Sequence, residues 1–115
     1  LAAQRLPRFT LARDLKDKPH QSVVTVIGCV TGRQAPGTAS GVTFITLEDP
    51  TGNINVIVWQ ASARAQKQAY LKSTILQVNG ILERGDGDVT HIIAGRLTNL
   101  SHLLGELDLK ARHFH

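Results

Sequence analysis

The sequence is poor in several residue types, and each shortage argues against a class of protein. Only five of the 115 residues are aromatic, namely three Phe, one Trp and one Tyr, and only one residue is cysteine. A disulfide scaffold needs an even set of cysteines, so the single Cys29 favours a reducing compartment. No apolar run approaches the roughly 20 residues of a membrane-crossing helix. The chain therefore has the composition of one soluble globular domain.

The beginning of the chain lacks two common signals. It starts with Leu1 rather than Met. It also lacks a basic segment followed by an apolar stretch and small residues, which is the pattern of a signal peptide. We expect a piece of a longer protein located in the cytoplasm, with no membrane partner.

Basic residues are concentrated at the start of the chain. The net charge is +4, and the first 18 residues hold five basic side chains against two acidic ones. From residue 19 to residue 99 the two signs nearly balance, with six basic and five acidic side chains. A basic segment of this kind suits phosphate groups, but it is equally typical of a solvated linker. The charge permits a nucleic-acid partner without requiring one.

The chain is predicted to have three parts: a linker over residues 1–20, a barrel over residues 21–99, and a C-terminal helix and tail over residues 100–115. Pro7 and Pro19 interrupt the linker, in which Thr10 is placed to cap one short helical turn. The C-terminal helix is predicted from leucines at helical spacing that end near Gly105, namely Leu97, Leu100, Leu103, Leu104 and Leu107.

Alternating β-branched residues predict strands through the middle of the chain. We expect the long first strand to bend at Gly28, and one of its faces carries Val24, Val26, Gly28 and Val30. The run VTFITLE forms a second strand, and DPTG then has the residues of a type I turn. The third strand, NINVIVW, is predicted to bury Ile54, Val56 and Val58.

One short helix, QASARAQKQAYLK, is predicted to separate the third strand from the fourth. The sequence GDGD predicts the turn between the fourth and fifth strands, and the fourth strand is expected to bury Leu76, Val78 and Leu82. In the fifth strand two sets of residues compete for the interior, Val89, His91 and Ile93 against Ile92 and Ala94.

This order of elements predicts an all-β fold. Five strands with a helix between the third and fourth are typical of a five-stranded Greek-key OB-fold barrel, here with a short C-terminal helix as well. A five-stranded sandwich stays open as an alternative. In an OB-fold the second and third strands carry the binding face.

Acidic residues do not form a catalytic pair in this sequence. Asp86 and Asp88 lie in turn sequence. A strand sends the adjacent Glu48 and Asp49 to opposite faces, and Asp49 is suited to capping the DPTG turn.

Histidines and nucleophiles give no stronger signal. His113 and His115 lie in a tail without further metal ligands, and His91 stands alone on a strand as a half-buried packing residue. There are no paired cysteines, no glycine-rich phosphate loop and no nucleophile motif. We expect no catalysis, metal or cofactor in this chain.

Two aromatic residues suggest a nucleic-acid interface. Single-stranded nucleic acid is held by aromatic platforms beside cations, and Phe44 and Trp59 lie on the second and third strands where such platforms belong. The alternative places Phe44 in the core and Trp59 under the interstrand helix. The rim of the interface is predicted to include Arg33, Arg84 and Arg96.

Several longer segments are similar to one protein family. The most specific is GRQAPGTASGVTFITLEDPTGNINVIVW, and it is followed by ILQVNGILER, THIIAGRLTNLSHLL and a closing HFH. These segments resemble the carboxy-terminal region of bacterial error-prone DNA polymerases, the mutasome-associated paralogues of the replicative C-family alpha subunit. The resemblance covers residues 22 to about 115.

The resemblance implies a parent enzyme that adds deoxynucleotides opposite damaged templates, with Mg²⁺ held by palm-domain carboxylates that this chain does not contain. It places Arg33 and Gln34 in the family's first barrel loop, and Phe44, Asn55 and Trp59 on its signature hairpin. The tail departs from the family's pattern, because His113 stands where an acidic residue is usual. A contact made by that tail is then expected to depend on pH.

Two functional hypotheses follow. In the first, the barrel binds single-stranded template DNA weakly, through Arg33, Gln34, Phe44, Asn55, Trp59, Arg84 and Arg96. In the second, it recruits the polymerase to an inactive Y-family-like polymerase, a RecA-like accessory protein or the sliding clamp. The residues of the second hypothesis are Leu100, Leu103, Leu104, Leu107 and Phe114, unless the leucines only cap the barrel.

Overall fold

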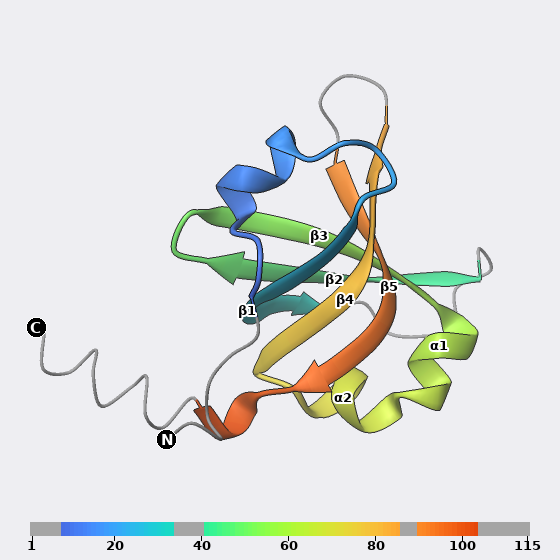
Figure 1. Ribbon diagram of the computed structural model, residues 1–115. Coiled ribbons are helices and arrows are strands. Elements are labelled where there is room, and N and C mark those ends of the chain that lie inside the picture. Colours follow the sequence, from blue (N-terminus) through green and yellow to red (C-terminus); the bar gives the residue numbers. More distant parts are fainter. Residues whose placement is uncertain (1–7, 34–40, 86–89, 104–115) are drawn as a thin grey trace, which may run out of the picture.

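The computed structural model describes residues 8–33, 41–85 and 90–103. Five strands close into a barrel in the order β1-β2-β3-β5-β4, and β1 completes it by pairing with both β2 and β4 (Figure 1). Only β3 and β5 run parallel among these pairs. The predicted all-β OB-type barrel is therefore confirmed. The elements are η2 (Ala12–Asp17), β1 (Val23–Arg33), β2 (Val42–Asp49), β3 (Gly52–Trp59), α1 (Gln60–Ala65), α2 (Lys67–Lys72), β4 (Ile75–Arg84), β5 (Thr90–Asn99) and η3 (Ser101–Leu103).

The inward faces of β1, β3 and β4 follow the predicted alternation. The first strand buries Val24 and Val26, and the predicted residues of β3 and β4 are almost fully covered. The β2–β3 hairpin closes at the DPTG turn, where Asp49 pairs with Gly52. The irregularity in β1 lies between Val30 and Gly32 rather than at Gly28. The residues buried from β3 and β4 are Ile54, Val56, Val58, Leu76, Val78 and Leu82.

The connector between β3 and β4 consists of two short helices instead of the predicted single one. Gln66 interrupts it with φ −115° and ψ 40°. Its side-chain amide donates to the Gly95 carbonyl oxygen at 3.0 Å, and its Oε1 accepts from the Leu97 backbone N–H at 2.7 Å. These bonds to β5 hold the break in place, because they satisfy strand groups that a continuous helix would leave unpaired. No helix in the described part of the chain is long and apolar enough to cross a membrane.

The structure shows which of the two sets of β5 residues faces the interior of the barrel. Ile92 and Ala94 point inward, whereas His91 and Ile93 are half-buried, as expected for His91 as a packing residue. Leu97 is a buried strand residue and does not begin the predicted leucine helix. The strand continues past Leu97 because Thr98 and Asn99 pair with Gln77 and Leu76 of β4, and η3 is the last element of the described residues. Val89, with residues 104–115, lies outside the described residues.

The predicted linker, residues 1–20, is called the leading segment below. Its described part, residues 8–20, packs against the barrel and is not a free linker. Leu15 is only 6% exposed and belongs to the barrel core. The guanidinium of Arg84 donates to the carbonyl oxygens of Leu15, Lys16 and Lys18. Leu11, not Thr10, stands at the start of η2, and that helix has no side-chain cap. Arg84 therefore holds this segment against the barrel, a structural role beside the rim position predicted for it.

Asp49 joins the leading segment to the hairpin turn. Its Oδ1 accepts from the backbone N–H of Thr51 at 2.7 Å, the Thr51 hydroxyl at 2.6 Å and the Gly52 N–H at 3.1 Å. Its Oδ2 accepts from the Ala12 N–H at 2.7 Å. Burial raises the pKa of this carboxyl, but the hydrogen bonds from Thr51, Ala12 and Gly52 outweigh it and hold the pKa below its ordinary 3.8. The predicted turn-capping role of Asp49 is confirmed.

An Asp49→Asn variant is expected to lose stability and part of its pH dependence. Because the folded pKa is depressed, the unfolded chain binds the proton first as pH falls. The stabilisation is thus complete above about pH 5 and disappears as pH falls through the folded pKa. Urea unfolding at pH 7 should show that the variant has lost about 1–3 kcal/mol of unfolding free energy. Between pH 5 and pH 3 the unfolding free energy of the variant should fall less than that of the wild type.

Asp14→Asn is the matched control, since Asp14 is exposed and its ion pair with Arg13 is long at 3.9 Å. The Asp14→Asn variant should lose less than about 0.5 kcal/mol of unfolding free energy. An Asp49→Asn protein with the wild-type dependence on pH would contradict the assignment.

Candidate functional site

Phe44 and Trp59 form an exposed aromatic pair on the outer face of the hairpin. Phe44 is 42% exposed and Trp59 is 55% exposed, so neither belongs to the core. Phe44 pairs with Ile57, two residues before Trp59, which places the two rings diagonally on neighbouring strands. The inward positions beside Phe44 are taken by Thr43 and Ile45. The alternatives of a core Phe44 and a covered Trp59 are therefore wrong.

The other predicted site residues are exposed on the barrel, bonded to the leading segment, or outside the described residues. Asn55 is exposed on the outer face of β3, opposite Thr46. Arg96 is exposed on β5, and Arg33 is exposed although its guanidinium donates to the Ser73 carbonyl oxygen at 2.5 Å. Arg84 is engaged with the leading segment, and Gln34 lies outside the described residues.

The connector adds three cations that the sequence reasoning treated only as helix formers. Arg64, Lys67 and Lys72 are all exposed. Arg64 lies on α1, which starts at the residue after Trp59. Gln66 bonds to Gly95 and Leu97, the two chain neighbours of Arg96, and so joins the connector to β5 at that residue. The signal was present in the sequence, because no acidic residue lies between Asp49 and Glu83.

Acidic side chains of the described residues lie elsewhere. Two are on η2, two at the closed end of the β2–β3 hairpin and one near the end of β4: Asp14, Asp17, Glu48, Asp49 and Glu83. Figure 1 shows η2 and the α1–α2 connector on opposite sides of the barrel. Arg13 and Asp14 make the one ion pair among the described residues. Among the described residues no acidic side chain lies on the connector, so its three cations give this side of the barrel a positive potential that begins directly after Trp59 in the chain.

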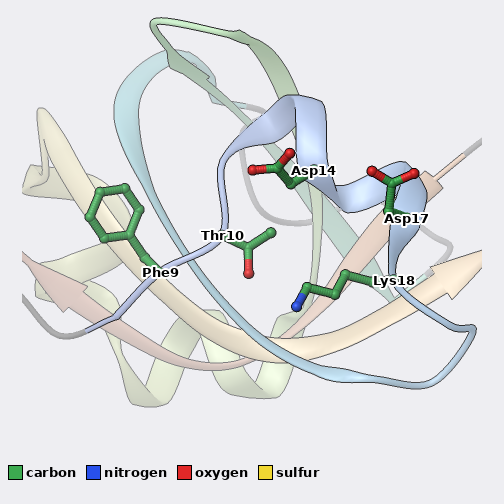
Figure 2. Close-up of a pocket in the computed structure, with 5 residues that line it drawn as sticks. All are labelled: Phe9, Thr10, Asp14, Asp17 and Lys18. Carbon is green, nitrogen blue, oxygen red and sulfur yellow. The ribbon is translucent and has the colours of Figure 1, made fainter.

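A hollow of 380 Å³ under the leading segment has a different character. Figure 2 shows the residues that line it, with the amine of Lys18 extending toward Thr10 and the carboxylates of Asp14 and Asp17 above on η2. The charged side chains of this hollow carry both signs, and they do not point toward one common position. Within residues 8–33, 41–85 and 90–103, no group of three His, Cys, Asp or Glu could hold a metal ion.

The remaining sequence candidates are not brought together. Glu48 is exposed and Asp49 buried, as expected for opposite faces of a strand. Leu100 and Leu103 are half-buried, and the Leu100 N–H donates to the Ile75 carbonyl oxygen at 2.9 Å. The other candidates lie outside the described residues, namely Asp86, Asp88, Leu104, Leu107, His113, Phe114 and His115.

Comparison with known proteins agrees with this geometry. Residues 24–100 match a family described as an OB-fold nucleic acid binding domain. The chain is 66% identical over 113 residues to the error-prone DNA polymerase of Vibrio campbellii, a match that covers 98% of this chain and 11% of that protein. The resemblance predicted from the sequence is thereby confirmed. The chain spans only about a tenth of the curated relatives that it matches.

Solved structures share the fold at low sequence identity. Asparaginyl-tRNA synthetase from Pyrococcus horikoshii superposes with a TM-score of 0.66 at 17% identity, over 83% of this chain and 23% of that one. An OBody bound to hen egg-white lysozyme superposes with a TM-score of 0.63 at 18% identity, over 84% of this chain and 98% of that one. These likenesses establish the barrel architecture alone.

Proposed function

Because the chain belongs to the family of OB-fold nucleic acid binding domains, we propose that its barrel holds single-stranded template DNA for an error-prone DNA polymerase. The exposed Phe44–Trp59 pair is the observation that carries the proposal. Both rings lie on the outer face of the hairpin, where a base can stack on each without any change in the core. The neighbouring cations then attract the sugar-phosphate backbone.

The stacking and electrostatic energies expected for this face predict a modest affinity for single-stranded DNA. A stacked base contributes about 1–3 kcal/mol, so two platforms supply roughly 2–6 kcal/mol. Electrostatic attraction adds to this, and it weakens with salt because binding releases counterions from the DNA. Asn55, exposed on the same face, supplies a donor and an acceptor for base edges. The barrel accordingly positions the template weakly, and it lets successive nucleotides pass.

Within the longer protein this chain acts as a binding module. Its curated relatives are named error-prone DNA polymerases, and on that basis we propose that the parent chain is a DNA-directed DNA polymerase. The polymerase chemistry, with its Mg²⁺, belongs to parts of the parent chain outside these 115 residues. The contribution of the barrel is to keep the template single-stranded near that active site.

Trp59 fluorescence gives a direct test, because Trp59 is the sole tryptophan of the chain. Titration with oligo-dT should quench its emission in a saturable manner, since a stacked thymine base lies against the indole ring. A titration of N-acetyltryptophanamide with the same DNA corrects for absorbance. Saturable DNA binding, measured by anisotropy, with unchanged Trp59 emission would remove Trp59 from the site.

A second candidate function is favoured by an apolar belt on the outside of the barrel. Five side chains lie in successive register across neighbouring strands: Val23 opposite Ile81, Ile81 opposite Ile93, Ile93 beside Ile57, and Ile57 opposite Phe44. Val23 is 83% exposed and Ile81 is 47% exposed. A contiguous apolar surface of this kind suits a protein partner. The partners implied by the resemblance are an inactive Y-family-like polymerase, a RecA-like accessory protein and the sliding clamp.

The two candidate functions share Phe44 but differ in the rest of the surface. DNA binding depends on Trp59 and on the cations near it. Partner binding depends on Val23 and Ile81, at the other end of the belt. Substitutions at Val23 and Ile81 therefore separate the two functions.

A further inference from the structure

The two connector helices enclose a small hollow that the aromatic pair does not use. Its volume is 200 Å³, and it is lined by Ala63, Arg64, Lys67, Tyr70 and Leu71. Ala63 and Tyr70 are buried, whereas Leu71 is 38% exposed. The hollow therefore has an apolar floor and, at its rim, two cationic side chains that are exposed to solvent.

The walls of this hollow are held in place by specific contacts. The hydroxyl of Tyr70 is hydrogen-bonded to the Thr43 hydroxyl at 2.5 Å, which fastens α2 to β2. Gln66 fixes the break between α1 and α2 through its bonds to Gly95 and Leu97. The shape is thus determined by the barrel and does not depend on the intrinsic stability of two six-residue helices.

We propose that this hollow is a second nucleotide site, which takes one base of a single-stranded nucleic acid while Arg64 and Lys67 hold the adjoining phosphates. The inference rests on the proposed function, and it extends the bound strand from the β2–β3 face onto the connector. An apolar cavity of about 150 Å³ accommodates a benzene ring, so a hollow of 200 Å³ has room for a pyrimidine ring. The lining offers few groups to read base edges, so the site is insensitive to sequence.

Continuity with the aromatic pair supports this extension. Trp59 is the residue before α1, and Arg64 lies five residues later, roughly 8 Å along a helix. One strand can therefore contact both. The absence of acidic residues from residue 50 to residue 82 means that no carboxylate within this stretch competes with phosphate for the two cations.

A comparison of short and long oligonucleotides tests the proposal. An oligo-dT of about four nucleotides covers the aromatic pair, and one of about 12 nucleotides also reaches the connector. The double variant Arg64→Gln with Lys67→Gln should bind the short oligonucleotide no more than about threefold more weakly, because the two cations act on it only through their field, and the long one roughly tenfold more weakly, because direct phosphate contacts are lost as well. Its salt slope for the long oligonucleotide should fall by about 1.4, since each released phosphate contact contributes roughly 0.7 on single strands.

The matched control removes the same charge from the other side of the barrel. Lys16 and Lys18 are exposed residues of the leading segment, and only their carbonyl oxygens bind Arg84. Lys16→Gln with Lys18→Gln should leave the binding of the long oligonucleotide within twofold of the wild type. An equal loss in both double variants would mean that only net charge matters, and it would overturn the proposed site.

Photo-crosslinking distinguishes a bound base from a nearby phosphate. Oligo-dT carrying 4-thiothymidine should crosslink to the peptide of residues 60–72 as well as to the hairpin. Crosslinks confined to the hairpin, with unchanged long-strand affinity in the Arg64 and Lys67 variant, would overturn the second site and leave the proposed function standing. If the wild type binds neither oligonucleotide, both proposals fail.

Discussion

A Gly80→Ala variant is expected to lose more than about 4 kcal/mol of unfolding free energy, or to fail to fold. A Cβ at Gly80 would lie 2.2 Å from the Ile93 carbonyl oxygen and 3.0 Å from the Cγ2 of Ile92. The nearest atom belongs to the backbone of β5, next to the register shift between Asn79 and Gly80. Relief of this overlap requires β4 and β5 to separate, which breaks hydrogen bonds of the barrel.

Gly32→Ala is the matched control, because it introduces the same methyl group into another strand. The nearest atoms to a Cβ at Gly32 are the Cβ and Oγ1 of Thr46, both at 3.5 Å, which is ordinary contact. Its effect should stay within about 1 kcal/mol. Urea unfolding followed by circular dichroism measures both variants. A Gly80→Ala protein as stable as Gly32→Ala would show that the two strands do not approach as closely as described.

The barrel was predictable from local patterns. Period-two alternation placed Ile54, Val56 and Val58 inward, and turn chemistry placed the hairpin at DPTG. Both signals act over a few residues, where sequence and backbone geometry are tightly linked. The faces of β5 were not predictable in this way, because apolar residues occur at both odd and even positions and only pairing with β3 and β4 distinguishes them.

Long-range contacts explain the features that the sequence did not reveal. The leading segment is ordered by Leu15 in the core and by Arg84, which is 69 positions away along the chain. No local pattern connects the two. The break in the connector depends likewise on a bond from Gln66 to Gly95, 29 positions away. Helix propensity alone favours an uninterrupted helix there.

The candidate site was only partly predictable. Alternation indicated that Phe44 and Trp59 lie on the hairpin, but their exposure depends on whether the connector covers them, which is a matter of tertiary packing. The bonds of Arg84 to the leading segment were not predictable, because a rim cation and a cation with a structural role look the same in sequence. The cations of the connector could have been found, since the stretch from residue 50 to residue 82 lacks acidic residues entirely.

A double variant, Phe44→Ala with Trp59→Ala, is expected to reduce the affinity for oligo-dT at least 30-fold. Each platform contributes about 1–3 kcal/mol, and tenfold in affinity corresponds to roughly 1.4 kcal/mol. Both side chains are more than 40% exposed, so their removal should leave the fold intact, which circular dichroism checks.

Val23→Ala with Ile81→Ala is the matched control for this variant. It shortens two exposed apolar side chains of the same belt away from Trp59, and its affinity for DNA should stay within about twofold of the wild type. Equal losses in the two double variants would mean that the apolar belt as a whole, and not the aromatic pair, carries the binding.

The most direct test of the account is the fluorescence anisotropy of labelled oligo-dT titrated with the wild-type protein at low and moderate salt. Binding should be saturable and should weaken as salt increases, because stacking on Phe44 and Trp59 is combined with attraction to the neighbouring cations. Absence of binding at roughly 50 µM protein and low salt would contradict DNA binding by this face, because two stacked bases supply up to about 6 kcal/mol and the attraction to the cations at low salt adds to it, which together correspond to a Kd of tens of micromolar or below.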